Sequence, residues 1–450
     1  MGLFSKTLTL PKSITASSFS LTEAPLPNRV ILPLRQYIGE PATACVSVGE
    51  KVKVGQLIAT AEKENSLPLH ASISGKVSDI REHLHHTGTR LAAVIIEADG
   101  ADSWLTARPE PEEVACLEPA EIRARIHEAG LICKGAHPLP LAQELLALDQ
   151  PKTHLALTGR RVVKGTDTLL ITGLDQEPSL GVNRYHAQRE HDHLAPGLAA
   201  LRTITGAQRT LFVVDKNHPP FPQLTEMVAA DEEEATEIIS LDGREFPLAL
   251  PIPLIKATLG REVALPYGHP RDVGVALYDM DTTICVGASL TSQMPQVDTL
   301  ISVGGGAIAH KGIVRVRIGT EIGALIESLG GFSKEPAKII LGGPMTGMAQ
   351  YELTTPIGKE ITGLFALSAD ETGIGKDYRQ CINCGLCVKV CPVNLVPGLL
   401  SLYCAKDRFD VAQREGLLSC IECGCCDYVC PSRRPMVHLF RHAKNQLLET

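Results

Sequence analysis

The 450-residue sequence predicts a multidomain protein that combines α/β and β units with a helical, cysteine-rich C-terminal unit. Three observations support this fold class. Glycine-punctuated runs of alternating apolar and polar residues dominate the N-terminal part. Apolar runs alternate with helical stretches between about residues 115 and 290. Two cysteine-rich runs follow residue 380. A chain of this length is expected to form several domains.

After an N-terminal segment over residues 1–29, residues 30–105 are predicted to form a small β unit. Residues 45–59 alternate apolar and polar positions around Gly49 and Gly55, and residues 66–77 repeat the pattern. Glycines at such short intervals are typical of tightly turned strands. The pattern resembles the barrel-sandwich hybrid fold of biotinyl and lipoyl carrier domains.

Residues 115–290 are predicted to form an α/β domain with a parallel sheet. Residues 119–130 have the pattern of an amphipathic helix that ends at Gly130. Residues 168–172 and 210–215 are predicted as buried strands, with a helix over 196–206 between them. Alternation of strands and helices favours a parallel sheet with helical crossovers.

Residues 291–350 are predicted to form a small β-grasp unit. Strands are expected over 299–303 and 312–318, and a further strand and turn over 338–345. A helix is expected over 320–330, with Thr320 as its N-cap. The last predicted unit, residues 365–450, contains the cysteine runs, and the segment between them has a helical pattern.

The composition restricts the classes of function. A net charge of −8 and an aromatic content of 4% argue against a nucleic-acid-binding surface. No apolar run approaches the roughly 18 residues that a membrane span requires. We therefore expect a cytoplasmic protein whose contact with a membrane would be made through partners.

Both cysteine runs fit the pattern C-x₂-C-x₂-C-x₃-C-P, which is typical of proteins with two [4Fe-4S] clusters. Three cysteines in one turn supply three thiolates to a cluster, and the fourth crosses to the other cluster. One cluster is therefore predicted on Cys381, Cys384, Cys387 and Cys430, and the other on Cys420, Cys423, Cys426 and Cys391.

Cys425 does not fit the spacing and is the surplus thiol of the second run. Zinc sites and disulfides are the alternative interpretations of these cysteines. Zinc ribbons use paired C-x₂-C knuckles without the fourth cysteine and proline, and disulfides require an oxidising compartment. Two complete copies of the motif favour iron–sulfur clusters.

With these units in this order, the chain resembles the RnfC family, also called RsxC, whose members belong to the Rnf ion-translocating electron transport complex. Residues 31–39, 45–52 and 95–100 are similar to its N-terminal signature. Residues 341–347, LGGPMTG, and the two cysteine runs are similar to its C-terminal half. The resemblance implies an SLBB domain for the β-grasp unit and an α/β domain similar to the FMN- and NADH-binding subunit of respiratory complex I.

Three loops of that implied cofactor site depart from the family pattern. The flavin loop G-x-G-G-A-G-F-P-T-x-x-K corresponds to residues 132–143, where Gly135 and Ala136 remain and Lys134 is predicted to be an exposed loop lysine. In the acidic loop, residues 172–179, Asp175 and Glu177 remain as cofactor-site candidates or as structural caps. The Y-P-x-G-G-x-K stretch, residues 246–252, has lost its glycines and lysine. The sequence therefore predicts that FMN and NADH are not bound in the usual way.

The resemblance implies an electron-transfer subunit, peripheral on the cytoplasmic face of the inner membrane. Its expected partners are other subunits of an Rnf-type membrane complex and a soluble electron donor, NADH or a protein. Two alternatives remain: a soluble RnfC-like adapter for a reductase of the proline-reductase-linked type, and an NADH dehydrogenase with altered flavin contacts. A scaffold without redox function would leave both cysteine motifs unexplained.

Overall fold

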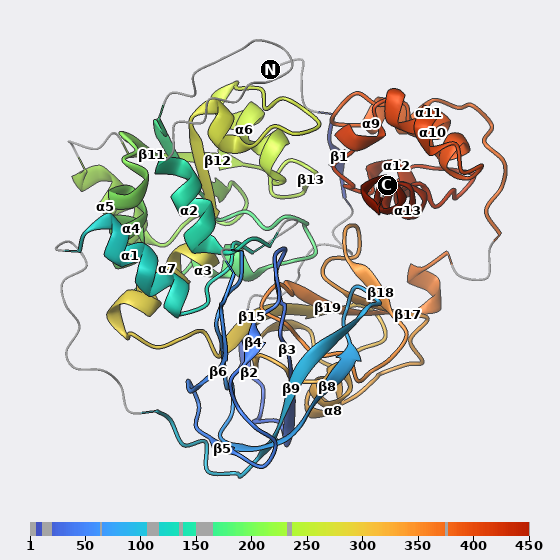
Figure 1. The fold of residues 1–450 in the computed structure, drawn as a ribbon. Helices are drawn as coiled ribbons and strands as arrows, with labels where there is room; N and C mark the ends of the chain where they lie inside the picture. The colour runs from blue at the N-terminus through green and yellow to red at the C-terminus, as the bar shows by residue number, and fades with distance from the viewer. Residues whose placement is uncertain are drawn as a thin grey trace.

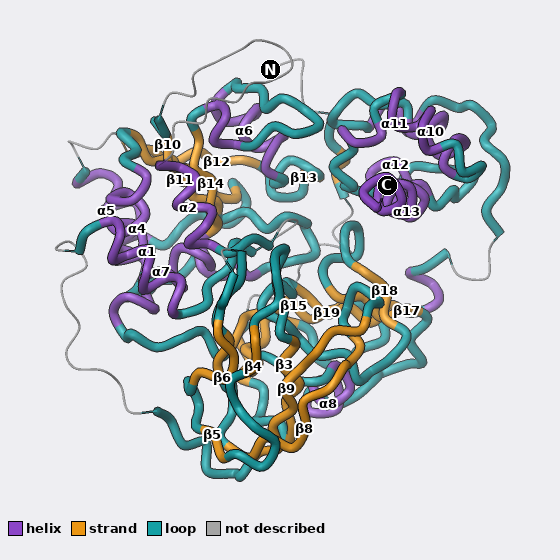
Figure 2. Tube along the Cα trace, in the orientation of Figure 1, coloured by secondary structure: helices purple, strands orange, loops and turns teal. Residues whose placement is uncertain are grey.

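The computed structural model describes residues 6–10, 20–63, 65–105, 117–134, 138–149, 165–231, 236–373 and 377–449. Two β-rich units lie together in the lower half of Figure 1, the α/β unit lies above them, and the helical cysteine-rich unit lies to one side. Figure 2 shows the same division, with helices gathered in the upper parts of the molecule. The multidomain α/β and β fold class is confirmed.

The first unit consists of a four-stranded antiparallel sheet with the order β3-β9-β8-β5 and a three-stranded sheet with the order β4-β6-β7. Val30 and Leu32 of β3 join one core with Ile58 of β6 and Ile96 of β9, because alternate residues of a strand point to the same face. The strands are β3 (Arg29–Pro33), β4 (Thr43–Ala44), β5 (Lys51–Val52), β6 (Leu57–Thr60), β7 (Leu69–His70), β8 (Gly75–Leu84) and β9 (Arg90–Ala98).

The α/β unit has a four-stranded parallel sheet with the order β12-β11-β10-β14. Strand β10 is buried on both faces, because Leu169 and Ile171 join the core under α1, α4 and α7, whereas Leu170 joins the core under α6. The elements are α1 (Pro119–Glu128), α2 (Leu141–Asp149), β10 (Thr168–Thr172), α3 (Val182–Ala187), α4 (Leu194–Thr205), β11 (Arg209–Asp215), α5 (Pro222–Ala230), β12 (Thr236–Leu241), β13 (Glu245–Phe246), α6 (Pro251–Leu259), β14 (Val275–Asp279) and α7 (Met280–Thr291).

The third unit has a six-stranded mixed sheet with the order β18-β17-β19-β15-β16-β2, and α8 packs against it. The predicted helix begins later than expected: Glu321 is the N-cap, and Thr320 Oγ1 instead donates to the carbonyl of Arg317 at 2.7 Å. Two strands come from outside residues 291–350. The elements are β2 (Leu21–Glu23), β15 (Asp298–Gly304), β16 (Gly312–Arg317), α8 (Ile322–Ser328), β17 (Lys338–Leu341), β18 (Met348–Gln350) and β19 (Gly363–Leu367).

The C-terminal unit is helical, as predicted for the segment between the cysteine runs. Its small core is formed by Leu400, Leu417, Met436 and Phe440 together with cysteine side chains. The helices are α9 (Leu386–Val390), α10 (Pro397–Cys404), α11 (Phe409–Arg414), α12 (Cys425–Tyr428) and α13 (Met436–Glu449).

A short N-terminal strand, β1 (Leu8–Thr9), joins the helical unit to the α/β unit. β1 pairs with β13, and the next residue, Leu10, packs with Phe246, Cys423 and Cys425. The side chain of Lys6 donates to the carbonyl of Val388 in α9 at 3.1 Å. The N-terminus therefore contributes to the position of the cysteine loops.

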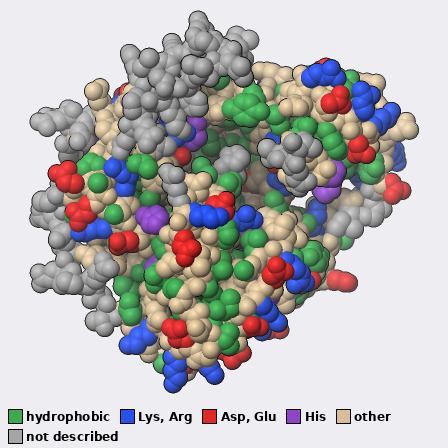
Figure 3. All heavy atoms as spheres, viewed as in Figure 1, with side chains coloured by type: hydrophobic (Ala, Val, Ile, Leu, Met, Phe, Trp, Pro, Cys, Tyr) green, Lys and Arg blue, Asp and Glu red, His purple; other side chains and the backbone are tan. Residues whose placement is uncertain are grey.

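Two surface properties bear on function. Among the described residues, no helix is both long enough and apolar enough to cross a bilayer. On the face drawn in Figure 3, the described Lys and Arg side chains are interspersed with Asp and Glu side chains, without a broad patch of either sign. This mixed surface agrees with the expectation that nucleic acid is not a partner.

Candidate functional site

The two cysteine loops have the same backbone shape. Asn383 and Glu422, which occupy equivalent positions in the two motifs, have φ values of 54° and 56°. Asn394 and Arg433, each three residues beyond the last cysteine of their motif, have φ values of 59° and 52°. Left-handed backbone is costly for residues other than glycine and is kept where the surrounding structure requires it. The repetition indicates that both loops are shaped for the same kind of ligand.

The sulfurs of both loops accept hydrogen bonds from the backbone. Three amides donate to them: Asn383 to Cys381 Sγ at 3.4 Å, Glu422 to Cys420 Sγ at 3.4 Å, and Leu395 to Cys391 Sγ at 3.3 Å. Such bonds stabilise negative charge on sulfur, which is the form that binds iron. The sequence pattern could not identify these donors, because they depend on the left-handed turns.

Cys391, the last cysteine of the first motif, lies beside the second motif. Burial raises the pKa of the Cys391 thiol, and the neighbouring Cys423 raises it further. Burial likewise raises the pKa of Cys426, with contributions from Cys420, Cys423 and Cys391. Four thiols from both motifs therefore occupy one neighbourhood. A buried group of four thiols, with amide donors on its sulfurs, fits a [4Fe-4S] cluster, whose binding would remove the thiol protons.

Cys425 lies against this group but has a different environment. Its side chain is fully buried and packs with Leu10, Phe246 and Leu250. A hydrogen bond between the Cys425 thiol and the Cys423 sulfur lowers the pKa of Cys423 and raises that of Cys425. The surplus cysteine is thus a neighbour of a proposed ligand.

The two loops differ in exposure. Ile382 in the first loop is 66% exposed, whereas the equivalent Ile421 is partly buried. Cys384 is exposed, and the equivalent Cys423 is buried. Apolar side chains near the first loop also reach solvent: Tyr378, Leu386, Val396 and Leu399. The first loop therefore faces solvent, and the second faces the rest of the molecule.

The second loop is fixed to the rest of the molecule through the turn over residues 343–347. Arg441 of α13 donates to Glu422 Oε2 at 2.8 Å and to the carbonyl of Thr346 at 2.7 Å. Gly424 lies so close to Met345 that a Cβ atom at this position would be 2.8 Å from the Met345 carbonyl oxygen. Backbone contact this close requires glycine.

Glu177, a predicted cofactor-site residue, holds the other side of the same turn. Its fully buried carboxylate accepts from the amides of Met345 at 2.9 Å and Thr346 at 2.7 Å, and from the Thr346 hydroxyl. Burial raises the pKa of Glu177. The acidic loop of the α/β unit is therefore connected through one turn to the second cysteine loop.

Asp175, the other acidic candidate, is paired within its own unit. It accepts from the amide of Asn183 at 2.9 Å, at the start of α3, and from Arg184 Nε at 2.9 Å. The side chains of Asp175 and Arg184 are almost fully buried. The predicted flavin-loop residues Gly135 and Ala136 lie outside the described residues.

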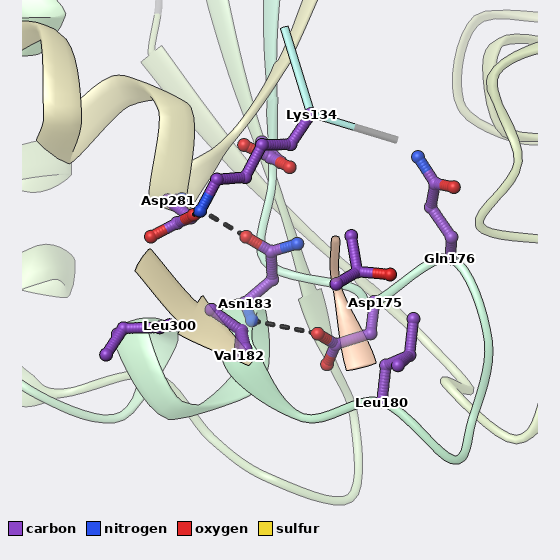
Figure 4. A pocket seen from close by; sticks show the side chains of 10 residues that line it. Lys134, Asp175, Gln176, Leu180, Val182, Asn183, Asp281 and Leu300 are labelled. Carbon is purple, nitrogen blue, oxygen red and sulfur yellow. Dashed lines mark hydrogen bonds and ion pairs between the residues drawn. The ribbon is translucent and has the colours of Figure 1, made fainter. Parts of the chain in front are cut away.

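Figure 4 shows the polar region between these elements. Lys134 forms an ion pair with Asp281 and donates to Thr299 Oγ1 at 2.8 Å. Its side chain is 6% exposed, so the prediction of an exposed loop lysine is wrong. Burial opposes ionisation of Asp281, but the charge of Lys134 outweighs it and lowers the pKa of Asp281. His186 adds a contact to Asp281 Oδ1 at 3.1 Å.

The pocket beside this ion pair is small. Lys134, Asp175, Asn183 and Asp281 line a cavity of about 20 Å³, which is enough for one water molecule. Organic cofactors occupy sites of roughly 300 Å³ or more. The described residues of this region pair with one another, and they do not fit FMN bound in the usual way.

Taken together, the repeated cysteine loops and the scaffold define an iron–sulfur protein with a flavoprotein-like α/β unit. Family models match in three places: the RnfC barrel sandwich hybrid domain over residues 6–101, the SLBB domain over 300–349 and the 4Fe-4S dicluster domain over 373–431. The chain belongs to the RnfC family, and two relatives illustrate the similarity.

The RnfC-type subunit of the proton-translocating ferredoxin:NAD(+) oxidoreductase complex of Clostridium ljungdahlii is 34% identical over 424 residues, 94% of this chain and 89% of that protein. Its counterpart in the Na(+)-translocating ferredoxin:NAD(+) oxidoreductase complex of Acetobacterium woodii is 31% identical over 438 residues, 95% of this chain and 94% of that protein. The similarity therefore extends over nearly the full length of both relatives.

Among solved structures, a chain of the NAD+-reducing [NiFe]-hydrogenase in the H2-reduced state matches with a TM-score of 0.51. The match covers 75% of this chain and 63% of that chain, at 17% identity. At this identity the likeness concerns the fold, and it agrees with the predicted flavoprotein-like α/β unit.

Proposed function

We propose that this chain is an electron-transfer subunit of an Rnf-type ion-translocating membrane complex and that electrons pass through two [4Fe-4S] clusters. The observation that carries the proposal is the placement of Cys391, from the first motif, beside Cys423 and Cys426 of the second. Crossing of the fourth cysteine is what a protein with two clusters requires.

The proposed ligands follow from this crossing. One cluster is held by Cys381, Cys384, Cys387 and Cys430, and the other by Cys420, Cys423, Cys426 and Cys391. Gly398 supports the first set, because a Cβ atom there would lie 3.5 Å from Cys387 Sγ and 3.7 Å from Cys381 Sγ. The clusters supply one-electron redox chemistry, and the chain supplies thiolates, amide donors and burial that set their potentials.

The difference in exposure gives the two clusters different roles. The cluster of Cys420, Cys423, Cys426 and Cys391 faces the interior and is joined to the α/β unit through the 343–347 turn. The cluster of Cys381, Cys384, Cys387 and Cys430 lies under an exposed apolar surface, which we call the Ile382 surface: Tyr378, Ile382, Leu386, Val396 and Leu399. An exposed apolar group beside a redox centre suits docking of a redox partner.

The α/β unit is proposed to act without FMN and NADH bound in the usual way. The support is the mutual pairing of its buried polar groups, above all Lys134 with Asp281 and Glu177 with the 343–347 turn. Its electrons would then come from a soluble protein donor. Stoichiometric flavin in anaerobically purified protein, bleached by NADH, would instead support the NADH dehydrogenase alternative.

The ligand assignment can be tested with three single variants: Cys391→Ser, Cys423→Ser and Cys384→Ser. Iron, sulfide and electron paramagnetic resonance spectra of the reduced proteins would be measured under anaerobic conditions. With crossed ligands, the spectrum of Cys391→Ser should match that of Cys423→Ser. A match with Cys384→Ser would show that each motif holds its own cluster, and zinc in place of iron would overturn the proposal.

Membrane assembly requires a separate experiment. The chain, tagged and expressed in its own cells, should co-isolate with integral-membrane redox subunits from detergent-solubilised cytoplasmic membranes. This result is expected for a peripheral subunit on the cytoplasmic face. Co-isolation with a soluble reductase alone would favour the adapter alternative.

A further inference from the structure

A histidine–carboxylate group lies far from the cysteine loops, where the first β unit meets the six-stranded sheet. His85 and His86 occupy the turn between β8 and β9, and Glu360 lies in the loop before β19. His86 Nδ1 is 3.0 Å from Glu360 Oε1, and His85 Nε2 is 3.4 Å from the same oxygen. One ligand atom from each residue lies within 4.8 Å of the others.

These side chains are buried and incompletely satisfied. The side chains of His85 and Glu360 are only 9% and 6% exposed, and that of His86 is 15% exposed. His85 Nε2 and Glu360 Oε2 are buried atoms without a hydrogen-bond partner among the described residues. A buried polar atom without a partner is costly, and a bound ion is one of the few ways to satisfy it.

The surroundings orient the three groups. His85 Nδ1 contacts Thr87 Oγ1 at 2.9 Å, which leaves Nε2 directed at Glu360. Gln350 of β18 donates to the carbonyl of His86 at 2.9 Å, and this fixes the hairpin turn to the neighbouring sheet. Figure 1 shows the β8–β9 hairpin beside β18. Hydrogen bonds of this kind on the second ring nitrogen are typical of metal-binding histidines.

Gly358 provides the space for the carboxylate. A Cβ atom at this position would lie 2.3 Å from Glu360 Oε2 and 2.6 Å from Oε1. The main chain beyond it is anchored, because Lys359 N donates to Gln36 Oε1 at 3.0 Å and Lys359 Nζ donates to the carbonyl of Gly130 at 2.7 Å. Glu360 is therefore held in place from both sides.

We infer that His85, His86 and Glu360 bind a divalent transition metal ion, of which Zn²⁺ is the best match. Two imidazole nitrogens and one carboxylate are a known ligand set for zinc, with remaining positions open to water. Ca²⁺ and Mg²⁺ fit less well, because they require more oxygen ligands than one carboxylate offers. Arg35 lies close enough to His85 to act on it electrostatically, and its positive charge disfavours an ion held by charge alone.

Such an ion would join two units that are otherwise held by side-chain and backbone contacts. The hairpin of the first β unit supplies two ligands, and the loop before β19 supplies the third. Since a metal that binds the folded state stabilises it by mass action, Zn²⁺ should strengthen this junction. The site is distinct from the proposed iron–sulfur clusters and does not depend on the proposed function.

The test measures zinc and iron on the same sample of full-length protein purified anaerobically with its clusters. After incubation with ZnCl₂ and gel filtration, the wild type should retain about one zinc per chain. His86→Ala and Glu360→Gln should lose most of this zinc while their iron and sulfide contents stay unchanged. His83→Ala, in strand β8 two residues before His85, is the matched control and should retain zinc.

A second measurement does not require a metal count. After treatment with a chelator that leaves the iron content intact, ZnCl₂ should raise the Tm of the wild type and of His83→Ala, but not of Glu360→Gln. Thr87→Ala should weaken zinc binding by roughly 10-fold, because it removes the contact that orients His85. Wild-type protein that retains no zinc and shows no zinc-dependent change in Tm would overturn the inference, as would equal zinc retention by Glu360→Gln.

Discussion

At the scale of single residues, the cysteines that could be assigned from spacing alone differ from the residue that spacing leaves out. Eight cysteines follow the motif, and Cys425 does not. Its hydrogen bond to Cys423 makes it a donor to a proposed ligand sulfur. Hydrogen bonds to ligand sulfurs raise the reduction potential of a cluster, because they stabilise the more negative reduced state.

Cys425→Ala should therefore lower the midpoint potential of the cluster proposed on Cys423, whereas Cys425→Ser, which keeps a donor, should change it less. Anaerobic redox titration followed by electron paramagnetic resonance measures both potentials. The other cluster serves as an internal reference. Equal potentials in the two variants and the wild type would show that the Cys425 thiol does not influence the cluster.

A second residue gives a pH dependence. Burial lowers the pKa of His70 in β7 to about 3, and Lys359 contributes to the same direction. Histidine in an unfolded chain has a pKa of about 6.5, so the unfolded state binds more protons below that pH. The contribution of neutral His70 to stability is therefore complete above about pH 6.5 and decreases as the pH falls toward 3.

His70→Gln removes this proton uptake. Between about pH 7 and 5, the free energy of unfolding should fall less in His70→Gln than in the wild type. Between about pH 7.5 and 8.5, the difference between the two proteins should stay constant. Anaerobic denaturant titrations at these pH values measure the difference, and parallel decreases below pH 6.5 would contradict the prediction.

The acidic residues of the α/β unit show what sequence can and cannot reveal at this scale. From sequence, Asp175 and Glu177 are either cofactor-site residues or structural caps. The structure pairs Asp175 with the start of α3 and Glu177 with the 343–347 turn. The second partner is more than 160 positions away in the chain, so no local pattern could have identified it.

At the scale of elements, periodicity identified the strands β10 and β11 and the helices α1 and α4 close to their observed bounds. It placed the start of α8 one residue early, because both Thr320 and Glu321 precede the first helical turn. It did not identify β2 as a strand of the six-stranded sheet. β2 has three residues, and its pairing with β16 joins distant parts of the chain.

The start of α13 is another element that depends on a distant residue. Asp427, in the second cysteine loop, accepts from the amides of Met436 at 2.9 Å and Val437 at 3.2 Å, the first two residues of α13. These amides lack partners within the helix, so a carboxylate stabilises them. The cap connects the second cysteine loop to the C-terminal helix.

Asp427→Ala should reduce the free energy of unfolding of the helical unit by about 1 kcal/mol, as expected for loss of a helix cap. Asp427→Asn retains an acceptor oxygen and should cost less. Anaerobic denaturation followed by circular dichroism measures the change. Iron content is the control, since a loss of cluster in either variant would itself destabilise the unit; equal stability of the three proteins with full iron content would contradict the prediction.

At the scale of the whole molecule, the order of units and the composition of each were predictable from sequence, because each unit has its own periodicity and glycine or cysteine pattern. The contacts between units were not predictable. Arg441, Glu422 and the 343–347 turn come together only in the folded chain, and they determine which cysteine loop faces the interior. The direction of the proposed electron path therefore depends on tertiary contacts.

This arrangement leads to a prediction for the Ile382 surface. If the exposed loop is where a redox partner docks, a charge at its most exposed apolar residue should weaken docking, since burial of an unpaired charge in an interface is costly. Ile382→Glu should slow electron transfer to or from the membrane partner by about tenfold, equivalent to ~1.4 kcal/mol. The iron content and the reduction of both clusters by dithionite should not change.

The matched control is Tyr351→Glu, which places the same charge on a side chain that is 74% exposed in the unit of the six-stranded sheet. It adds charge and removes an exposed apolar group, but it lies outside the cysteine loops. Stopped-flow reduction with solubilised membrane partner compares the two variants with the wild type. Slowing by Ile382→Glu alone would locate docking at the first cysteine loop, because both variants change the net charge equally. Equal slowing would indicate a general effect of charge, and slowing by Tyr351→Glu alone would place the docking site on the six-stranded sheet.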